Sequence, residues 1–95
     1  AGSLDFAAPS RSSWLAPSAD VARSAELDRV GIEAGVRISG SARLRDSVVL
    51  PGATIGARAK LHSVLVGPET EIAPGARLEN AFVVRENGET VVRPL

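Results

Sequence analysis

His62 is the single histidine of this 95-residue chain and the one side chain suited to general-base catalysis near neutral pH. In acyl transfer, such a histidine would take the proton of an attacking hydroxyl or amine group. The competing interpretation is a histidine on a solvated surface. The sequence has no cysteine, and a metal site would need more ligands than one histidine. We therefore assign no catalytic residue, keep His62 as the only candidate, and predict no metal site.

Three cations stand 17 residues apart in the sequence: Arg43, Lys60 and Arg77. Glu26 precedes Arg43 by the same interval. If the fold stacks these positions, the three like charges repel one another, and a bound anion or acidic partner would neutralise them. We predict an anion-binding or partner-binding site here. The alternative is that the three side chains spread apart in solvent or pair with neighbouring acids.

Large aliphatic residues repeat with the same period of 17, in steps of six, six and five residues. The columns of equivalent residues are Leu15, Ile32, Val49, Val66 and Val83, then Ile38, Ile55 and Ile72, then Leu27, Leu44, Leu61 and Leu78. This spacing fits neither a helix of period 3.6 nor a simple alternating strand. It favours an all-β fold in which residues 15–84 form about four triangular coils of 17 residues, stacked as parallel strands.

The residue four places after each aliphatic is also small or apolar, and we expect it to point into the coil. In the third segment of each period this residue is Gly31, Val48, Leu65 or Phe82. If that fourth residue points inward, Val30 and Val64 face outward on the third side, and Leu50 and Val84 face outward on the first. Exposed aliphatic residues on a flat wall predict self-association through it.

The two ends depart from the repeat, as the terminal caps of a repeat protein do. Residues 1–14 are Ser-rich, and we interpret them as a linker or N-terminal cap in which Phe6 and Trp14 cover the first coil. Residues 85–95 contain Asn87-Gly88 between β-branched residues, which predicts a hairpin. This C-terminal hairpin cap would shield the open edge of the last coil.

The charge balance disfavours two classes of partner. Eleven basic and eleven acidic residues cancel, and the pI is near 6.8, so we expect no binding to nucleic acid or to an anionic membrane. The sequence has no apolar run of membrane-spanning length and no signal-peptide pattern at its start. We expect a cytoplasmic protein. The chain does not begin with Met, and we expect it to be part of something longer.

The segments 55–60 and 72–77 resemble the hexapeptide repeat of left-handed parallel β-helices, and the left hand of the coil is implied by this resemblance. The phrasing of residues 44–56 and 61–67 is similar to the C-terminal β-helix of mannose-1-phosphate guanylyltransferase-like and other sugar-1-phosphate nucleotidyltransferases. The resemblance implies a separate N-terminal catalytic domain that uses Mg²⁺ to join a nucleoside triphosphate to a sugar phosphate. No Gly-rich phosphate loop of that kind occurs in this sequence.

Two functional hypotheses follow from the sequence. The first is a non-catalytic oligomerisation or regulatory domain without a cofactor of its own, which contacts an N-terminal catalytic domain and forms a homo-oligomer. The second is a minimal hexapeptide-repeat acyltransferase that uses His62 and an acyl-CoA or similar donor. Such acyltransferases usually carry an inserted loop that closes the site, and the regular spacing of residues 15–82 leaves no room for one.

Overall fold

The computed structural model describes residues 13–95, which form strands, turns and no helix. The strands of the coils are β1 (Trp14–Leu15), β2 (Asp20–Val21), β3 (Glu26–Asp28), β4 (Gly31–Ile32), β5 (Arg37–Ile38), β6 (Arg43–Arg45), β7 (Val48–Val49), β8 (Thr54–Ile55), β9 (Lys60–Val66), β10 (Glu71–Ile72) and β11 (Arg77–Glu86), and β12 (Glu89–Pro94) follows them. No helix long and apolar enough to cross a membrane occurs among residues 13–95.

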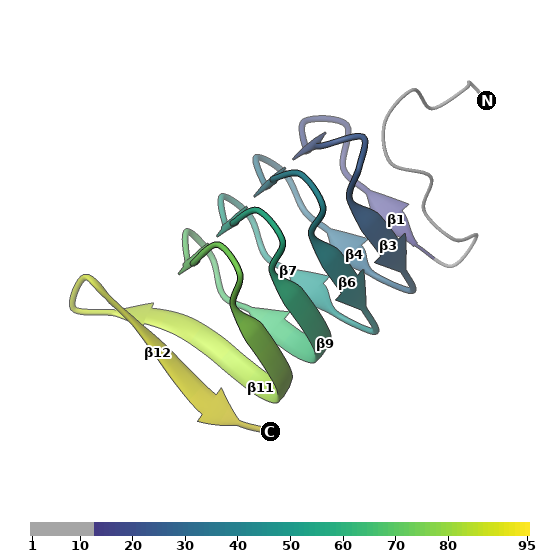
Figure 1. Cartoon of the computed structure of the whole chain (residues 1–95). Coiled ribbons are helices and arrows are strands. Elements are labelled where there is room, and N and C mark those ends of the chain that lie inside the picture. The colour runs from purple at the N-terminus through teal and green to yellow at the C-terminus, as the bar shows by residue number, and fades with distance from the viewer. Residues whose placement is uncertain (1–12) are drawn as a thin grey trace.

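The chain winds into a parallel β-solenoid of about four turns, each 17 residues long (Figure 1). Each strand of a coil pairs in parallel with the strand one turn later, as Leu15 does with Ile32 and Ile38 with Ile55. The β1 side holds β1, β4, β7 and the C-terminal parts of β9 and β11, while the β2 side holds β2, β5, β8 and β10. The β3 side holds β3, β6 and the N-terminal parts of β9 and β11. The predicted solenoid is confirmed, and its left hand stays a prediction.

The core consists of inward columns that run the length of the solenoid. Ile32, Val49, Val66 and Val83 have no exposed surface, and Ile55 lies equally deep on the β2 side. Burying each such side chain stabilises the fold by roughly 1.5–3 kcal/mol. The small residues predicted inside after the first two aliphatics are also buried in the middle coils: Val36, Ala42, Ala53 and Ala59 are all 0 % exposed. These columns confirm the predicted phase on two of the three sides.

On the β1 side the predicted phase is wrong by one residue. Val30 and Val64, expected to face outward, are 3 % and 2 % exposed, whereas Val48, expected inside, is 40 % exposed. The cause is the short third segment, which has five residues instead of six. It turns at a single residue in the left-handed conformation, Asp46 in the second coil (φ 51°), so the chain points inward one position earlier.

Left-handed backbone conformations define all three corners of the coil. The residues with positive φ at the corners are Gly35, Gly52 and Glu69 at the first, Ser41, Arg58 and Gly75 at the second, and Arg29, Asp46, Ser63 and Asn80 at the third. Glycine adopts this conformation without strain, which suits Gly35, Gly52 and Gly75 to their corners. At the other corner positions the fold holds residues other than glycine in the left-handed conformation.

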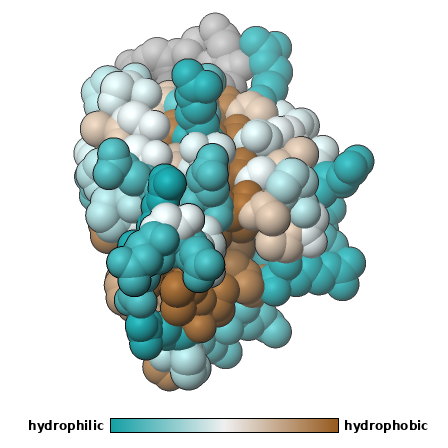
Figure 2. All heavy atoms as spheres, turned by 90° about the vertical axis from the view of Figure 1, so that its left-hand side faces the viewer, coloured by the Kyte–Doolittle hydropathy of each residue, from teal (hydrophilic) through white to brown (hydrophobic). Residues whose placement is uncertain are grey.

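A β-hairpin follows the last coil, as predicted, and it covers the β1 side of that coil only. β12 runs antiparallel to β11, and Glu86 pairs with Glu89 around Asn87 and Gly88, which both have positive φ. That geometry is the type I′ turn favoured by Asn-Gly. The hairpin pairs only with residues Ala81–Glu86, so β10 and residues 77–79 of β11 pair on one edge alone. Figure 2 looks at this end and shows a hydrophobic patch bordered by hydrophilic residues.

At the other end of the chain, Phe6 lies outside the described residues. Trp14 begins β1 and pairs with Gly31, with its side chain 53 % exposed. The solenoid therefore includes Trp14 as a strand residue.

Candidate functional site

His62 lies exposed on the outer surface of the β3 side, in agreement with the interpretation of a histidine on a solvated surface. It is paired in register with Arg45 on one side and Glu79 on the other, and Arg45 is paired with Asp28. These four residues form one column across four coils. The imidazole is 47 % exposed.

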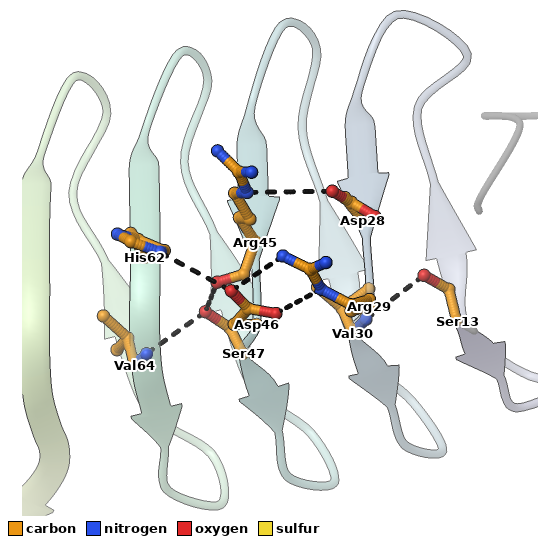
Figure 3. Close-up of polar contacts among 9 residues, drawn as sticks. All are labelled: Ser13, Asp28, Arg29, Val30, Arg45, Asp46, Ser47, His62 and Val64. Atoms are coloured by element: carbon orange, nitrogen blue, oxygen red, sulfur yellow. Dashed lines mark hydrogen bonds and ion pairs between the residues drawn. The ribbon is translucent and has the colours of Figure 1, made fainter.

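Both ring nitrogens of His62 face carboxylates of the same chain, those of Asp46 and Glu79, and Figure 3 shows His62 beside Asp46. Nε2 lies 3.6 Å from Oδ2 of Asp46, and Nδ1 lies 3.6 Å from Oε1 of Glu79. A general base needs one nitrogen directed at the group that it deprotonates. The geometry instead suits an imidazole between two acids on a solvated surface.

Asp46 is held by two hydrogen bonds from the Arg29 guanidinium, from Nε at 2.5 Å and from Nη2 at 3.1 Å. These hydrogen bonds lower the pKa of the Asp46 carboxyl below its ordinary value of 3.8, against an opposing effect of desolvation. The same hydrogen bond to Asp46 raises the pKa of Arg29. Nearby, Nε of Arg45 lies 3.7 Å from Oδ2 of Asp28. The third corner therefore carries a surface network of charged side chains.

A shallow groove of about 550 Å³ lies on the β3 side between two rows of outward side chains. Its charged lining residues are Glu26, Asp28, Arg43, Arg45 and Lys60. Arg43 contacts Glu26 through Nε at 3.0 Å, so acids and bases are largely paired along this groove. This balance leaves little net field to attract a charged ligand.

The second hollow, of about 420 Å³, differs in charge. It lies at the second corner and is lined by Ser41, Arg43, Arg58, Lys60, Gly75 and Arg77. The structure thus brings together the three cations that the sequence analysis selected, and register pairs Arg43 with Lys60 and Lys60 with Arg77. Arg58 and Ser41 were missed. The signal was present, because both belong to a column of corner residues two positions before the cations.

The outer surface of the β1 side is apolar. Val48 is 40 % exposed, and its in-register neighbours Leu65 and Phe82 are half-buried on the same face. Leu50 and Val84, which the sequence analysis placed outside, lie two residues further along this face and are half-buried. We call these five residues the apolar strip. Val30 and Val64 belong to the core instead.

A metal site finds no support among residues 13–95, which contain no group of three or more histidine, cysteine or acidic side chains placed to hold an ion. Asp46 and Glu26 face arginine side chains, and the described carboxylates do not fit a magnesium site. The Mg²⁺ implied by the family resemblance concerns a catalytic domain outside this chain, and that expectation stays a prediction.

A family model of the GMPPB C-terminal domain matches residues 11–92. The chain belongs to this family. No curated protein matches the chain in sequence. Family membership agrees with the predicted resemblance and with the fold, and it identifies the chain as the β-helix domain of a sugar nucleotidyltransferase.

As a GMPPB C-terminal domain, the chain presents three surface features: the charge network around His62, the cationic hollow at the second corner and the apolar strip. Each occupies a different part of the solenoid surface. Two of them suggest binding, of an anion and of an apolar partner, and both rest on residues that repeat every 17 positions.

Proposed function

We propose that this domain is an assembly module: it joins copies of a sugar nucleotidyltransferase and takes no part in the transfer reaction. In that arrangement a separate N-terminal domain uses Mg²⁺ to join a nucleoside triphosphate to a sugar phosphate, with release of pyrophosphate. The domain contributes a rigid solenoid whose outer walls contact a second copy.

The observation that carries the proposal is the apolar strip. Residues 48, 65 and 82 stand in register on three successive coils, with parallel strands about 4.8 Å apart, so their side chains form a continuous row. Trp14, 53 % exposed, extends the same row at the N-terminal end through Gly31. A flat apolar row of this kind is self-complementary under a two-fold axis, which is the symmetry of most homodimers.

The outer column of the β1 side also carries large apolar side chains. Outside lie Val48, Leu65 and Phe82, whereas the inner column has Ser47 in the corresponding second coil. Packing of the core does not require large apolar side chains on the outer face. Contact with a partner would account for them.

Replacing Val48 with lysine tests the proposal. Val48 is 40 % exposed, so the charge perturbs the wall and leaves the core intact. We expect Val48→Lys to weaken self-association at least tenfold, because a desolvated ammonium group in the contact is costly. Sedimentation equilibrium of the wild-type and variant proteins over a concentration series measures this.

The matched control is Thr54→Lys. Thr54 is the first residue of β8, as Val48 is of β7, but it lies on the β2 side. We expect the control to keep the wild-type mass. A wild-type protein that is monomeric at all concentrations would overturn the proposal, as would a Val48→Lys variant that associates like the wild type.

The acyltransferase alternative makes a different prediction for His62. Under the assembly proposal, His62→Ala leaves the oligomeric mass unchanged, and the protein does not bind an acyl-CoA in equilibrium dialysis. Saturable acyl-CoA binding that is lost in His62→Ala would favour the enzyme hypothesis instead.

A further inference from the structure

The cationic hollow at the second corner differs from the groove on the β3 side because its charged lining is of one sign. Arg43, Lys60 and Arg77 begin the strands of successive coils, and register places them in adjacent rows about 4.8 Å apart. Arg58 adds a fourth positive charge from the corner itself. No acidic residue lines the hollow.

Acidic residues of the described chain neutralise the positive charges of the hollow only in part. Arg43 has an ion pair with Glu26 at 3.0 Å, and that pair is well exposed. Among residues 13–95, no carboxylate lies within 4 Å of the charged groups of Arg58, Lys60 or Arg77. Stacked like charges repel one another, so the free protein has an unfavourable electrostatic energy that a bound anion would remove.

The shape and donors of the hollow suit a small, multiply charged anion. Its volume is about 420 Å³, and the space around Gly75 is open, because a Cβ added there would have no atom within 4 Å. Arginine guanidinium groups bind phosphoryl oxygens through two parallel hydrogen bonds, and Lys60 supplies a compact ammonium charge. Ser41 lines the same hollow and carries a hydroxyl group that can donate a further hydrogen bond.

We infer that this hollow binds a diphosphate group, with the cations of adjacent coils contacting successive phosphoryl groups. The ligand class is a small phosphorylated molecule, and inorganic pyrophosphate is its simplest member. The inference uses only the second corner and does not depend on the apolar strip or on self-association.

Isothermal titration with pyrophosphate, inorganic phosphate and sodium chloride at matched ionic strength tests the inference. We expect saturable binding of pyrophosphate, weaker binding of phosphate by at least fivefold, and no response to chloride. The thermal midpoint should rise with pyrophosphate concentration in the same order, because a ligand that binds only the folded state stabilises it. Equal responses to all three salts at matched ionic strength would overturn the inference.

Two variants separate binding from folding. Lys60→Glu converts the column into alternating signs from Glu26 to Arg77, so the free variant should be as stable as the wild type or more so, with pyrophosphate affinity at least tenfold lower. Arg58→Gly places glycine at a corner with φ 61°, the residue that the next coil has at Gly75. It should also keep its thermal midpoint and lose at least threefold in affinity.

Arg85→Gln is the matched control, since Arg85 is an exposed arginine of β11 outside the hollow. We expect it to bind pyrophosphate as the wild type does. Wild-type affinity in Lys60→Glu would overturn the assignment. So would an equal loss in Arg85→Gln, which would indicate attraction to net charge alone.

Discussion

Asp46 combines a left-handed backbone with a paired carboxylate at the third corner. Its φ is 51°, and its side chain accepts two hydrogen bonds from Arg29 while lying 3.6 Å from Nε2 of His62. Asparagine occupies the equivalent corner one turn beyond Ser63, at Asn80. An Asp46→Asn change therefore suits the backbone and removes only the charge, which makes Asp46 a clean site for a pH experiment.

The lowered pKa of Asp46 predicts a pH-dependent contribution to stability. A carboxyl whose pKa is lower in the folded state stabilises that state above its ordinary value of 3.8, and this contribution is lost as pH falls through the lowered folded pKa. We expect Asp46→Asn to be less stable than the wild type at pH 7. The difference should shrink as pH falls below about 4 and vanish in stronger acid. Urea unfolding over a pH series measures the difference.

Arg29→Gln supplies the control for this prediction, because Arg29 is the main cause of the lowered pKa. In the Arg29→Gln background, Asp46→Asn should have a smaller effect whose pH dependence is largely gone. If the difference in stability between the wild type and Asp46→Asn stays constant from pH 7 to pH 3, the lowered pKa of Asp46 is not its cause.

At the scale of the strands, close stacking of coils limits side-chain size at one position. Gly56 follows β8 and is buried, and a Cβ added there would lie 2.5 Å from the backbone nitrogen of Pro74 and 2.8 Å from the carbonyl oxygen of Ile72. Backbone atoms of the next coil cannot move aside without breaking the ladder. This local contact with residues 72–74 therefore requires glycine at position 56, whereas the equivalent positions of the two preceding coils hold Ala22 and Ser39.

Gly56→Ala should destabilise the fold by about 1–3 kcal/mol, the usual cost of overpacking a close contact. Chemical unfolding with the linear extrapolation method measures the change. Gly31→Ala is the control, because its added Cβ would meet only the Val48 methyl groups at 4.0 Å. We expect that variant to match the wild type within about 0.5 kcal/mol. Equal losses in the two variants would show that spacing is not the cause.

The strands also show why sequence reasoning placed one column wrongly. Val30, Ser47, Val64 and Ala81 are the inner residues after the third corner, while Gly31, Val48, Leu65 and Phe82 lie outside. The outer set is the fourth residue after each aliphatic, a position that is inward on the other two sides, so the same rule placed it in the core. The true phase depends on a corner made by one residue, and backbone conformation of that kind has no reliable mark in side-chain types.

For the whole molecule, the direction of the ladder distinguishes the last coil from the others. Backbone N–H groups of Thr54 and Lys60 donate to carbonyls of the following coil, at Thr70 and Ala76. The equivalent amides of Glu71 and Arg77 have no following coil, because β12 pairs only with residues 81–86.

Hydrogen exchange should report this asymmetry. We expect the amides of Thr54 and Lys60 to exchange at least a hundredfold more slowly than those of Glu71 and Arg77, since the latter are not held in a ladder. Residue-resolved exchange measured by NMR tests the prediction. Similar protection at all four amides would mean that another segment or molecule covers the open end.

The sequence was sufficient for the architecture because a solenoid repeats the same information in each turn. Columns such as Ile38, Ile55 and Ile72 revealed the period, and Asn87-Gly88 marked the hairpin. The binding features were only partly predictable. Register alone aligned Arg43, Lys60 and Arg77, but the place of Arg58 beside them and the contact of His62 with Asp46 involve neighbouring columns, whose separation depends on corner geometry.

Every residue of the ladder pairs with the residue 17 positions later, and this constant spacing limits how such a domain can change in evolution. Each coil meets the next through the same pairing, so duplication or loss of one complete turn leaves the remaining interfaces intact. Insertion of a single residue within a strand would instead turn inward side chains outward along that turn. The length of the solenoid can therefore vary readily only in whole turns, and surface rows such as the apolar strip would lengthen or shorten with it.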